Sequence, residues 1–305
     1  MATIAQWING ARPRTLPTAL APVIAGFAAA QHVNESPSWT RTLGAFAVAI
    51  ALVIGVNFAN DYSDGIRGTD ADRVGPQRLV GSGAASPGAV RTAALICFAI
   101  AAAVGIWLSL ATHWWLILVG AVCIVAAWFY TGGSRPYGYA GFGEVAVFVF
   151  FGLVAVCGTQ LVVGGKIDLF GVLIAVAIGS FSAAVLVTNN LRDIDTDAAT
   201  GKRTLAVILG DYSTRYLYAF LMTLPFVITV ILAFHHPWTL AGLAVAPLAN
   251  AAGRTVVGSK NQAGAQGPDL IRVLGQTGLI MAGWAVIIAA AFTWGIDGIP
   301  HGHLF

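Results

Sequence analysis

Nine apolar segments follow one another along the 305 residues of this chain, and this succession restricts its fold more than any other feature. A helix needs about 20 mostly apolar residues to cross the hydrocarbon core of a bilayer. Only 10% of the residues are charged, whereas soluble domains carry about 25%. The excess apolar surface therefore needs lipid as its solvent. The predicted spans are 16–31, 42–60, 90–111, 114–131, 143–164, 168–189, 215–234, 238–257 and 272–295.

These spans predict an all-α integral membrane protein with about nine transmembrane helices, forming a single domain over residues 1–305. The 36 glycines suit close packing of helices in a bilayer. Cys97, Cys123 and Cys157 all lie in apolar runs without CxxC or Cys/His neighbours, so we expect buried thiols rather than disulfides or a metal site. The N-terminal segment has no signal-peptide layout, and the net charge of +3 gives no reason to expect a nucleic-acid partner.

The basic residues predict the orientation of the spans. With nine spans, fourteen of the sixteen Lys and Arg residues fall on the side of the N-terminus, and only Arg41 and Lys166 fall on the other. Cytoplasmic loops carry such an excess of basic residues. We therefore expect a multi-pass protein of the cell membrane with its N-terminus in the cytoplasm.

The acidic residues gather on this same side, which suggests a functional site there rather than a purely topological bias. Ten of the thirteen Asp and Glu residues fall with the bases, whereas all six histidines fall on the opposite side or at its edge. Chemistry on the acidic side is therefore not expected to use imidazole.

The first acidic segment continues the second predicted span. It reads Asn57-Phe-Ala-Asn60-Asp61-Tyr-Ser-Asp64, and Asp70 follows shortly after. Asn57, Asp61 and Asp64 are spaced i, i+4 and i+7, so they are expected on one face of a helix.

The second acidic segment continues the sixth predicted span. Asn189, Asp193 and Asp197 are spaced i, i+4 and i+8, and Asn190 lies beside the first of them. Either segment alone could be a solvated helix end. Their corresponding positions, four spans apart in a weak internal repeat, argue for one shared site.

Carboxylates that converge in this way repel one another unless cations lie between them. Hard oxygen donors suit Mg²⁺, which usually takes one or two carboxylates together with substrate phosphates. The nearby basic residues are then phosphate partners rather than partners of the acids: Arg67, Arg73, Arg78, Lys202 and Arg203. Beside an apolar cavity in the membrane, these groups predict a site for a lipid diphosphate.

At these residues the sequence resembles the UbiA superfamily of intramembrane prenyltransferases. That superfamily has an Asn/Asp-rich motif after its second helix and a DxxxD motif after its sixth. Asp193 and Asp197 match the second motif, and Asn60-Asp61-x-x-Asp64 begins the first. The first motif then departs from the general NDxxDxxxD form, because position 68 is Gly and the next acid is Asp70.

Within the superfamily, the chain is most similar to the 1,4-dihydroxy-2-naphthoate polyprenyltransferases. Beyond the first acidic motif, the similarity rests on three further segments, and it extends over nearly the whole chain. These segments are Arg12-Pro-Arg14-Thr-Leu-Pro17, Tyr130-Thr-Gly-Gly-Ser-Arg135-Pro-Tyr137 and Asn189-Asn190-Leu-Arg192-Asp193 with Gly201-Lys202-Arg203-Thr-Leu205.

The resemblance implies transfer of a polyprenyl group from its diphosphate to 1,4-dihydroxy-2-naphthoate, with loss of CO₂ and formation of demethylmenaquinone. It also implies a Mg²⁺ cofactor, for which Mn²⁺ could substitute. The expected metal ligands are Asp61, Asp64, Asp193 and Asp197, with Asp70 as a further candidate; the expected diphosphate ligands are Arg67, Arg78, Arg135, Lys202 and Arg203. The expected substrate pocket contains Arg14, Asn57, Asn60, Tyr130, Tyr137, Glu144, Asn189 and Asn190.

Several alternatives remain open at the level of sequence. Tyr130 and Tyr137 could instead be interfacial aromatic residues, and Glu144 could be a helix N-terminal acid. Another acceptor, such as 4-hydroxybenzoate or homogentisate, would fit the same superfamily. A transporter is a more distant alternative, although one would be expected to carry polar groups on both faces.

Overall fold

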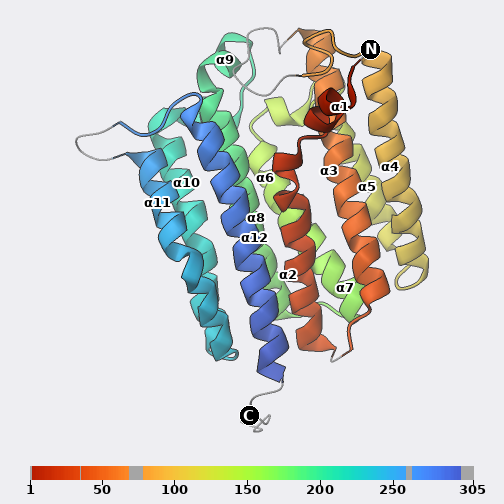
Figure 1. Cartoon of the computed structure of the whole chain (residues 1–305), viewed down its shortest axis with the longest axis vertical. Coiled ribbons are helices and arrows are strands. Elements are labelled where there is room, and N and C mark those ends of the chain that lie inside the picture. The colour runs from red at the N-terminus through yellow and green to blue at the C-terminus, as the bar shows by residue number, and fades with distance from the viewer. Residues whose placement is uncertain (1, 35, 69–77, 259–262, 297–305) are drawn as a thin grey trace.

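A computed structural model shows a bundle of long helices that run roughly along one axis (Figure 1). The structure describes residues 2–34, 36–68, 78–258 and 263–296, and residues 294–296 are described as backbone only. Every regular element in these ranges is helical. The predicted all-α class is therefore confirmed.

The chain begins with a short helix, α1 (Ile4–Ala11), that the hydropathy pattern did not predict. Thr3 starts it through a capping box, because its hydroxyl accepts the Gln6 amide while the Gln6 side chain accepts the Thr3 amide. A 3₁₀ turn, η1 (Pro13–Thr15), then leads into α2 (Pro17–Val33) at a bend of 46°. Pro17 suits the first turn of α2, since its missing N–H would have no helical partner there.

The remaining elements follow in the order that the apolar segments predict. The first half contains α3 (Trp39–Arg67), α4 (Pro87–Leu110), α5 (Leu116–Phe129), η2 (Tyr137–Tyr139), α6 (Gly143–Val147), the π-helix η3 (Phe148–Cys157) and α7 (Gly158–Gly164). The second half contains α8 (Leu169–Arg192), α9 (Ile194–Ala199), α10 (Leu205–Ala233), η4 (Pro237–Val245), α11 (Ala246–Val257) and α12 (Asp269–Ile296).

Each predicted span coincides with one helix or with consecutive helical elements, although not every one is long enough to cross a membrane as a single straight helix. Among the described residues, seven helices are long and apolar enough to cross a membrane, and α1–η1 with α2 forms an eighth if the bent pair is one span. The ninth, α5, has 14 residues. The seventh predicted span began at residue 215, whereas α10 begins at Leu205 and bends at Gly210, whose φ of 78° suits glycine.

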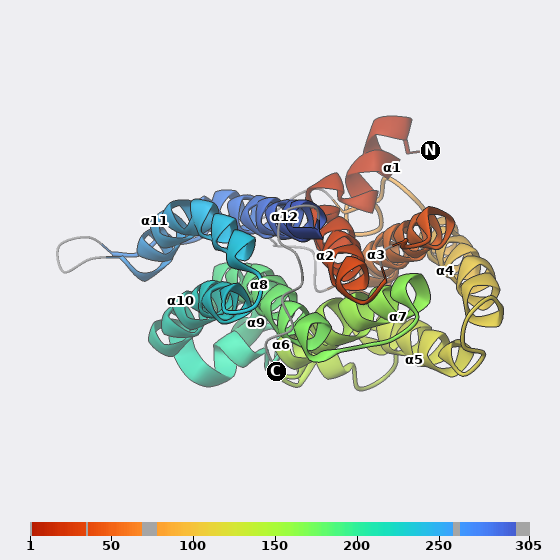
Figure 2. The ribbon, with the colours of Figure 1, turned by 90° about the horizontal axis from the view of Figure 1, so that it is seen from below.

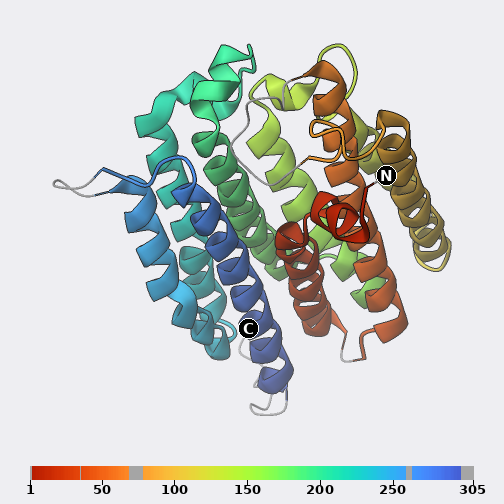
Figure 3. The same cartoon turned by 45° about the horizontal axis from the view of Figure 1, so that its top comes forward.

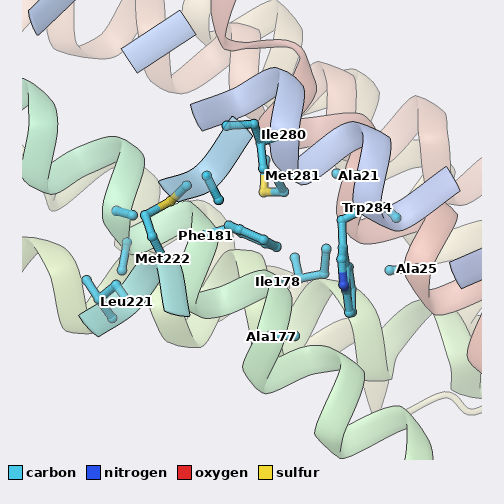
Figure 4. Packing of buried hydrophobic residues seen from close by; sticks show 14 of the residues in the cluster. Ala21, Ala25, Ala177, Ile178, Phe181, Leu221, Met222, Ile280, Met281 and Trp284 are labelled. Carbon is cyan, nitrogen blue, oxygen red and sulfur yellow. The ribbon is translucent and has the colours of Figure 1, made fainter. Parts of the chain in front are cut away.

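The main core lies where α8 packs against α2, α10, α12 and η3. Phe181 of α8 and Trp284 of α12 meet there edge to face, beside Met281 and Met222 (Figure 4). The view along the helices in Figure 2 shows α8 between α10 and α12 on one side and α6 on the other. This packing fixes the position of α8, which carries the second acidic segment at its end.

Close helix contacts depend on glycine at one crossing in particular. A Cβ added to Gly152 of η3 would lie 2.5 Å from the Cα of Gly179 in α8. The two backbones therefore touch, as small residues allow inside a membrane. The C-terminal ends of α3 and α8 reach the same end of the bundle as α1 and α9 (Figure 1), and this end is turned toward the viewer in Figure 3. We call this the acidic end.

Candidate active site

A cavity of about 720 Å³ lies inside the bundle, and residues of α2, α3, α4, α5, η3 and α8 form most of its lining. Its charged lining lies at the acidic end, where α3, α8 and α9 terminate. From there the lining continues past Phe150 and Phe151 of η3 to Leu116 at the start of α5 and Val162 of α7, near the opposite end of the helices. The charged side chains that line it are Arg12, Asp64, Arg78, Asp193, Asp197 and Lys202.

Asp64 lies three residues before the end of α3 and is 4% exposed. The Tyr139 hydroxyl donates a hydrogen bond to its Oδ1 at 2.5 Å. The Nη2 atom of Arg78 lies 3.8 Å from its Oδ2. A carboxylate, a phenol and a guanidinium thus meet at the charged end of the cavity.

Asp193 and Asp197 face the cavity from the junction of α8 and α9. The long helix ends at Arg192, Asp193 caps it, and the short helix restarts at Ile194, so the predicted continuous helical face is broken there. Arg192 binds both oxygens of Asp193 at 2.7 and 2.5 Å. The Nζ atom of Lys202 lies 3.8 Å from Oδ1 of Asp197.

Asp61 is placed differently from the other three predicted acids. Its Oδ2 accepts the Leu79 amide at 2.8 Å and its Oδ1 accepts the Val80 amide at 3.0 Å. It is 1% exposed and is not among the described residues that line the cavity. The predicted metal contact of Asp61 is therefore not supported, because its side chain does not line the cavity and both of its oxygens accept backbone amides.

Asn60 lines the cavity where Asp61 does not. Its Oδ1 accepts the Thr131 hydroxyl at 2.8 Å. The cavity side of α3 therefore follows Asn57, Asn60 and Asp64, rather than the predicted face through Asp61. Asp70, the further candidate ligand, lies outside the described residues.

The cavity has the donors that Mg²⁺ prefers, in an arrangement that leaves room for substrate oxygens. Within the described ranges, no three His, Cys, Asp or Glu side chains lie close enough to hold one metal ion together. Asp64, Asp193 and Asp197 nevertheless present carboxylates to one cavity from two segments. Mg²⁺ usually takes one or two carboxylates plus phosphate oxygens. The donor set therefore fits a magnesium diphosphate.

Only two of the five predicted diphosphate ligands line the cavity: Arg78 and Lys202. Arg67 instead donates to the carbonyls of Thr131 and Gly133, which ties the end of α3 to the turn after α5. Arg135 and Arg203 are exposed and lie outside the lining. These three assignments are corrected. A basic residue that is close in sequence to an acidic motif does not necessarily point into the cavity.

The four predicted asparagines all line the cavity, and the side chain of each has a hydrogen-bond partner. Asn57 donates from Nδ2 to the Ala11 carbonyl and the Thr15 hydroxyl, both at 3.0 Å, so it fixes the turn between α1 and α2. Asn189 accepts from Arg192 at 3.0 Å. Asn190 donates to Glu144 at 2.8 Å.

The predicted aromatic residues Tyr130 and Tyr137 also line the cavity and pack edge to face, with ring centroids 5.5 Å apart. The Tyr137 hydroxyl donates to the Ala126 carbonyl at 2.8 Å. Burial, with a smaller electrostatic contribution from Cys123, raises the pKa of Tyr137 to about 12. Its phenol is therefore protonated at neutral pH.

Glu144 is buried behind the cavity wall rather than in it. It is 5% exposed, and it is absent from the described cavity lining. Its Oε1 accepts from Asn190, whereas its Oε2 has no hydrogen-bond partner among the described residues. The structure thus places Glu144 one side chain away from the substrate space.

Several residues at the site were not selected from the sequence. Arg12 lines the cavity, whereas the predicted Arg14 is exposed and does not. Arg12 has a left-handed backbone, with φ 56°, which is uncommon for a non-glycine residue and is often found at functional sites. Tyr139 and Arg192 were also missed. The Arg-Pro-Arg segment contained the signal for Arg12, but it could not show which arginine faces inward.

Known proteins share the sequence pattern and the fold of this chain. The model of the UbiA prenyltransferase family matches residues 19–267. A 1,4-dihydroxy-2-naphthoate octaprenyltransferase from Mycobacterium tuberculosis is 56% identical over 97% of this chain and 99% of its own length. The protein of the same name from Escherichia coli is 34% identical over 79% of this chain and 82% of its own length.

Solved structures share the fold at low sequence identity. A UbiA homologue from Archaeoglobus fulgidus, bound to DMAPP and Mg²⁺, matches with a TM-score of 0.67 at 14% identity, over 94% of this chain and 99% of that one. An apo UbiA homologue from Aeropyrum pernix matches with the same TM-score at 15% identity, over 92% of this chain and 98% of that one. With the family model matched over most of its length, this chain belongs to the UbiA prenyltransferase family.

Proposed function

We propose that this membrane enzyme transfers a polyprenyl group from polyprenyl diphosphate to 1,4-dihydroxy-2-naphthoate, with decarboxylation, and thereby forms demethylmenaquinol, the reduced form of demethylmenaquinone. The observation that carries the proposal is a single cavity with a charged end and a long apolar continuation. The name shared by the relatives at 56% and 34% identity supports this acceptor.

The charged end suits the diphosphate. Arg12, Arg78 and Lys202 supply cationic donors for its oxygens. Asp64, Asp193 and Asp197 supply carboxylates for Mg²⁺, with Mn²⁺ as a substitute. When bound, the metal would neutralise the charge that develops on the leaving diphosphate. Tyr139 and Arg192 keep Asp64 and Asp193 in place by the hydrogen bonds described above.

The apolar part suits the polyprenyl chain and the allylic carbon. Phe150, Phe151 and Tyr130 line the cavity, and aromatic faces attract a developing cation. Apolar walls also exclude water, which would otherwise capture that cation and give the free alcohol. The lining near Leu116 and Val162 leaves room for the hydrocarbon to extend along the bundle.

The reaction balances without an added oxidant or a strong base. The allylic C–O bond breaks, and its electron pair leaves with the diphosphate. The ring carbon that carries the carboxylate forms the new C–C bond. Loss of that carboxylate as CO₂ returns its electron pair to the ring and restores aromaticity. This fits a cavity whose described lining contains no histidine.

We further propose that the chain acts as one domain in the cell membrane, with the acidic end in the cytoplasm. The distribution of basic residues supports this orientation, with fourteen of sixteen on the side of the N-terminus. Cysteine labelling from each side of intact cells, at single introduced cysteines near Ser82 and Lys166, would measure it. Access to Ser82 from outside the cell would reverse the assignment.

The test of the reaction uses acceptor labelled in its carboxyl carbon. Purified protein in lipid, Mg²⁺, a polyprenyl diphosphate and the labelled naphthoate should yield labelled CO₂ and an unlabelled prenylated product. Label retained in the product would indicate a different reaction. Product with 4-hydroxybenzoate or homogentisate, but none with the naphthoate, would mean that another aromatic compound is the acceptor.

A further inference from the structure

Asp61 is the most deeply buried of the four predicted acids, at 1% exposure. Each of its oxygens accepts a backbone amide, from Leu79 at 2.8 Å and from Val80 at 3.0 Å. Asp61 therefore has a defined structural partner, which is the segment 79–80.

That segment is also held by close packing on both sides. Leu79 is 2% exposed and belongs to the core cluster around Phe58 and Phe98. A Cβ on Gly10 of α1 would lie 2.6 Å from Cδ1 of Leu79, and a Cβ on Gly65 of α3 would lie 2.4 Å from Cγ1 of Val80. The two residues are thus fixed between α1 and α3, with Asp61 binding their amides.

Arg78 directly precedes this fixed pair and faces the cavity. It lies in the lining with Asp64, and its Nη2 is 3.8 Å from Oδ2 of that acid. Neither Asp61 nor Leu79 nor Val80 is among the described lining residues. The hydrogen bonds of Asp61 therefore connect it to the substrate space through the backbone segment that follows Arg78.

We infer that Asp61 is a positioning residue: it holds the backbone of residues 79–80 so that Arg78 meets the substrate's diphosphate, and it does not bind the metal. This deepens the proposed function and depends on the diphosphate site in it. The same sequence motif thus contains two acids with different tasks. Asp64 faces the ligand, and Asp61 anchors the segment that brings in a cation.

The substitution Asp61→Asn separates the two roles. The Asn carbonyl can accept one of the two amides, but its Nδ2 would face the other N–H, and two donors do not bond. The 79–80 segment should loosen and Arg78 should lose its fixed position. A metal ligand changed in the same way would instead weaken metal binding directly.

The measurement is binding of inorganic diphosphate to the whole chain in lipid nanodiscs, by calorimetry, over a range of Mg²⁺ concentrations. We expect Asp61→Asn to weaken diphosphate binding about tenfold, as when one charge-assisted contact is lost. The Mg²⁺ concentration for half-saturation should stay within about twofold of wild type, whereas Asp64→Asn should raise it about tenfold or more.

A double-mutant cycle with Arg78→Ala gives the second readout. If Asp61 acts through Arg78, then Asp61→Asn should cost little more once Arg78 is gone, so the two effects should not add. Leu79→Ala loosens the same segment without changing Asp61, and it should reproduce the phenotype of Asp61→Asn. It also keeps the inference testable if Asp61→Asn does not fold.

The matched control is Phe98→Leu, which disturbs the same core cluster away from the site. It should lower thermal stability but leave diphosphate binding unchanged. A large rise in the Mg²⁺ requirement of Asp61→Asn, with rescue by excess Mg²⁺, would overturn the inference and make Asp61 a ligand. Additive effects with Arg78→Ala would also overturn it. Normal diphosphate binding without prenyl transfer would instead count against the proposed function alone.

Discussion

Arg192 binds both carboxylate oxygens of Asp193, from Nε to Oδ1 at 2.7 Å and from Nη2 to Oδ2 at 2.5 Å. The two side chains are 4% and 8% exposed, and the same Nη2 also donates to Asn189 at 3.0 Å. The junction of α8 and α9 is thereby fixed at the point where its first acid faces the cavity. A buried two-point contact of this kind gives orientation as well as attraction.

We expect Arg192→Gln to lower kcat about tenfold at saturating Mg²⁺, because Asp193 loses the contact that fixes its side chain. Arg192→Lys should not restore the rate, since an ammonium group cannot reproduce the planar fork. Initial rates of prenyl transfer would measure both. Arg203→Gln is the control, because Arg203 is exposed and outside the cavity lining. A full rate in Arg192→Lys would mean that charge alone matters there.

The three acids that face the cavity should each be essential for rate. Asp64→Ala, Asp193→Ala and Asp197→Ala should each lower kcat at least about a hundredfold, in line with the loss of a positioned electrostatic group. Each variant should remain folded, which size-exclusion chromatography in detergent would check. Near-normal activity in any one of them would remove that acid from the proposed site.

Removal of divalent metal should abolish the reaction. Excess EDTA should stop product formation, and Mg²⁺ or Mn²⁺ added back should restore it, because carboxylates alone repel the diphosphate they surround. Product would be followed by mass spectrometry. Full activity in the presence of the chelator would contradict the metal role of all three acids.

Asp168 should contribute to stability, with a pH dependence, at the end of the bundle away from the site. It caps α8 by accepting from Gly171 at 2.9 Å, and it also accepts from Gln160 at 2.8 Å and lies 2.6 Å from His32 Nδ1. Burial alone would raise the pKa of Asp168, but these hydrogen bonds outweigh it and lower the pKa.

A lowered pKa in the folded state means that this stabilisation is present above the unfolded value of about 3.9 and is lost as the pH falls through the folded value. Asp168→Asn should therefore reduce thermal stability at pH 7 by a few degrees, since an N-cap contributes about 1 kcal/mol. The difference from wild type should shrink below about pH 4. Prenyl transfer at 25 °C should stay normal. Lys166→Gln, an exposed neighbour, is the control.

The number and length of the apolar segments determined the membrane class and the approximate position of every span. Hydrophobic segments about 20 residues long leave few alternatives in a bilayer, because each backbone polar group must be satisfied within the segment. The predicted seventh span began at residue 215, and the pattern could not show that α10 begins at Leu205 and bends at Gly210. That bend depends on a single backbone conformation.

The sequence also placed Asp64, Asp193 and Asp197 at one site, because corresponding ends of two helices in a repeat point the same way. It could not separate Asp61 from Asn60. Successive residues on a helix differ by about 100°, so either could face a cavity whose direction is set by the packing of the other helices.

Only the tertiary structure decided which polar groups form hydrogen bonds with one another across the chain. Asp61 accepts hydrogen bonds from the amides of Leu79 and Val80. Arg67 donates hydrogen bonds to the carbonyls of Thr131 and Gly133. Backbone groups are present at every residue, so nothing in the sequence marks which of them will bind a given side chain. Composition and spacing determine where charge gathers, and long-range packing determines which charges remain for the substrate.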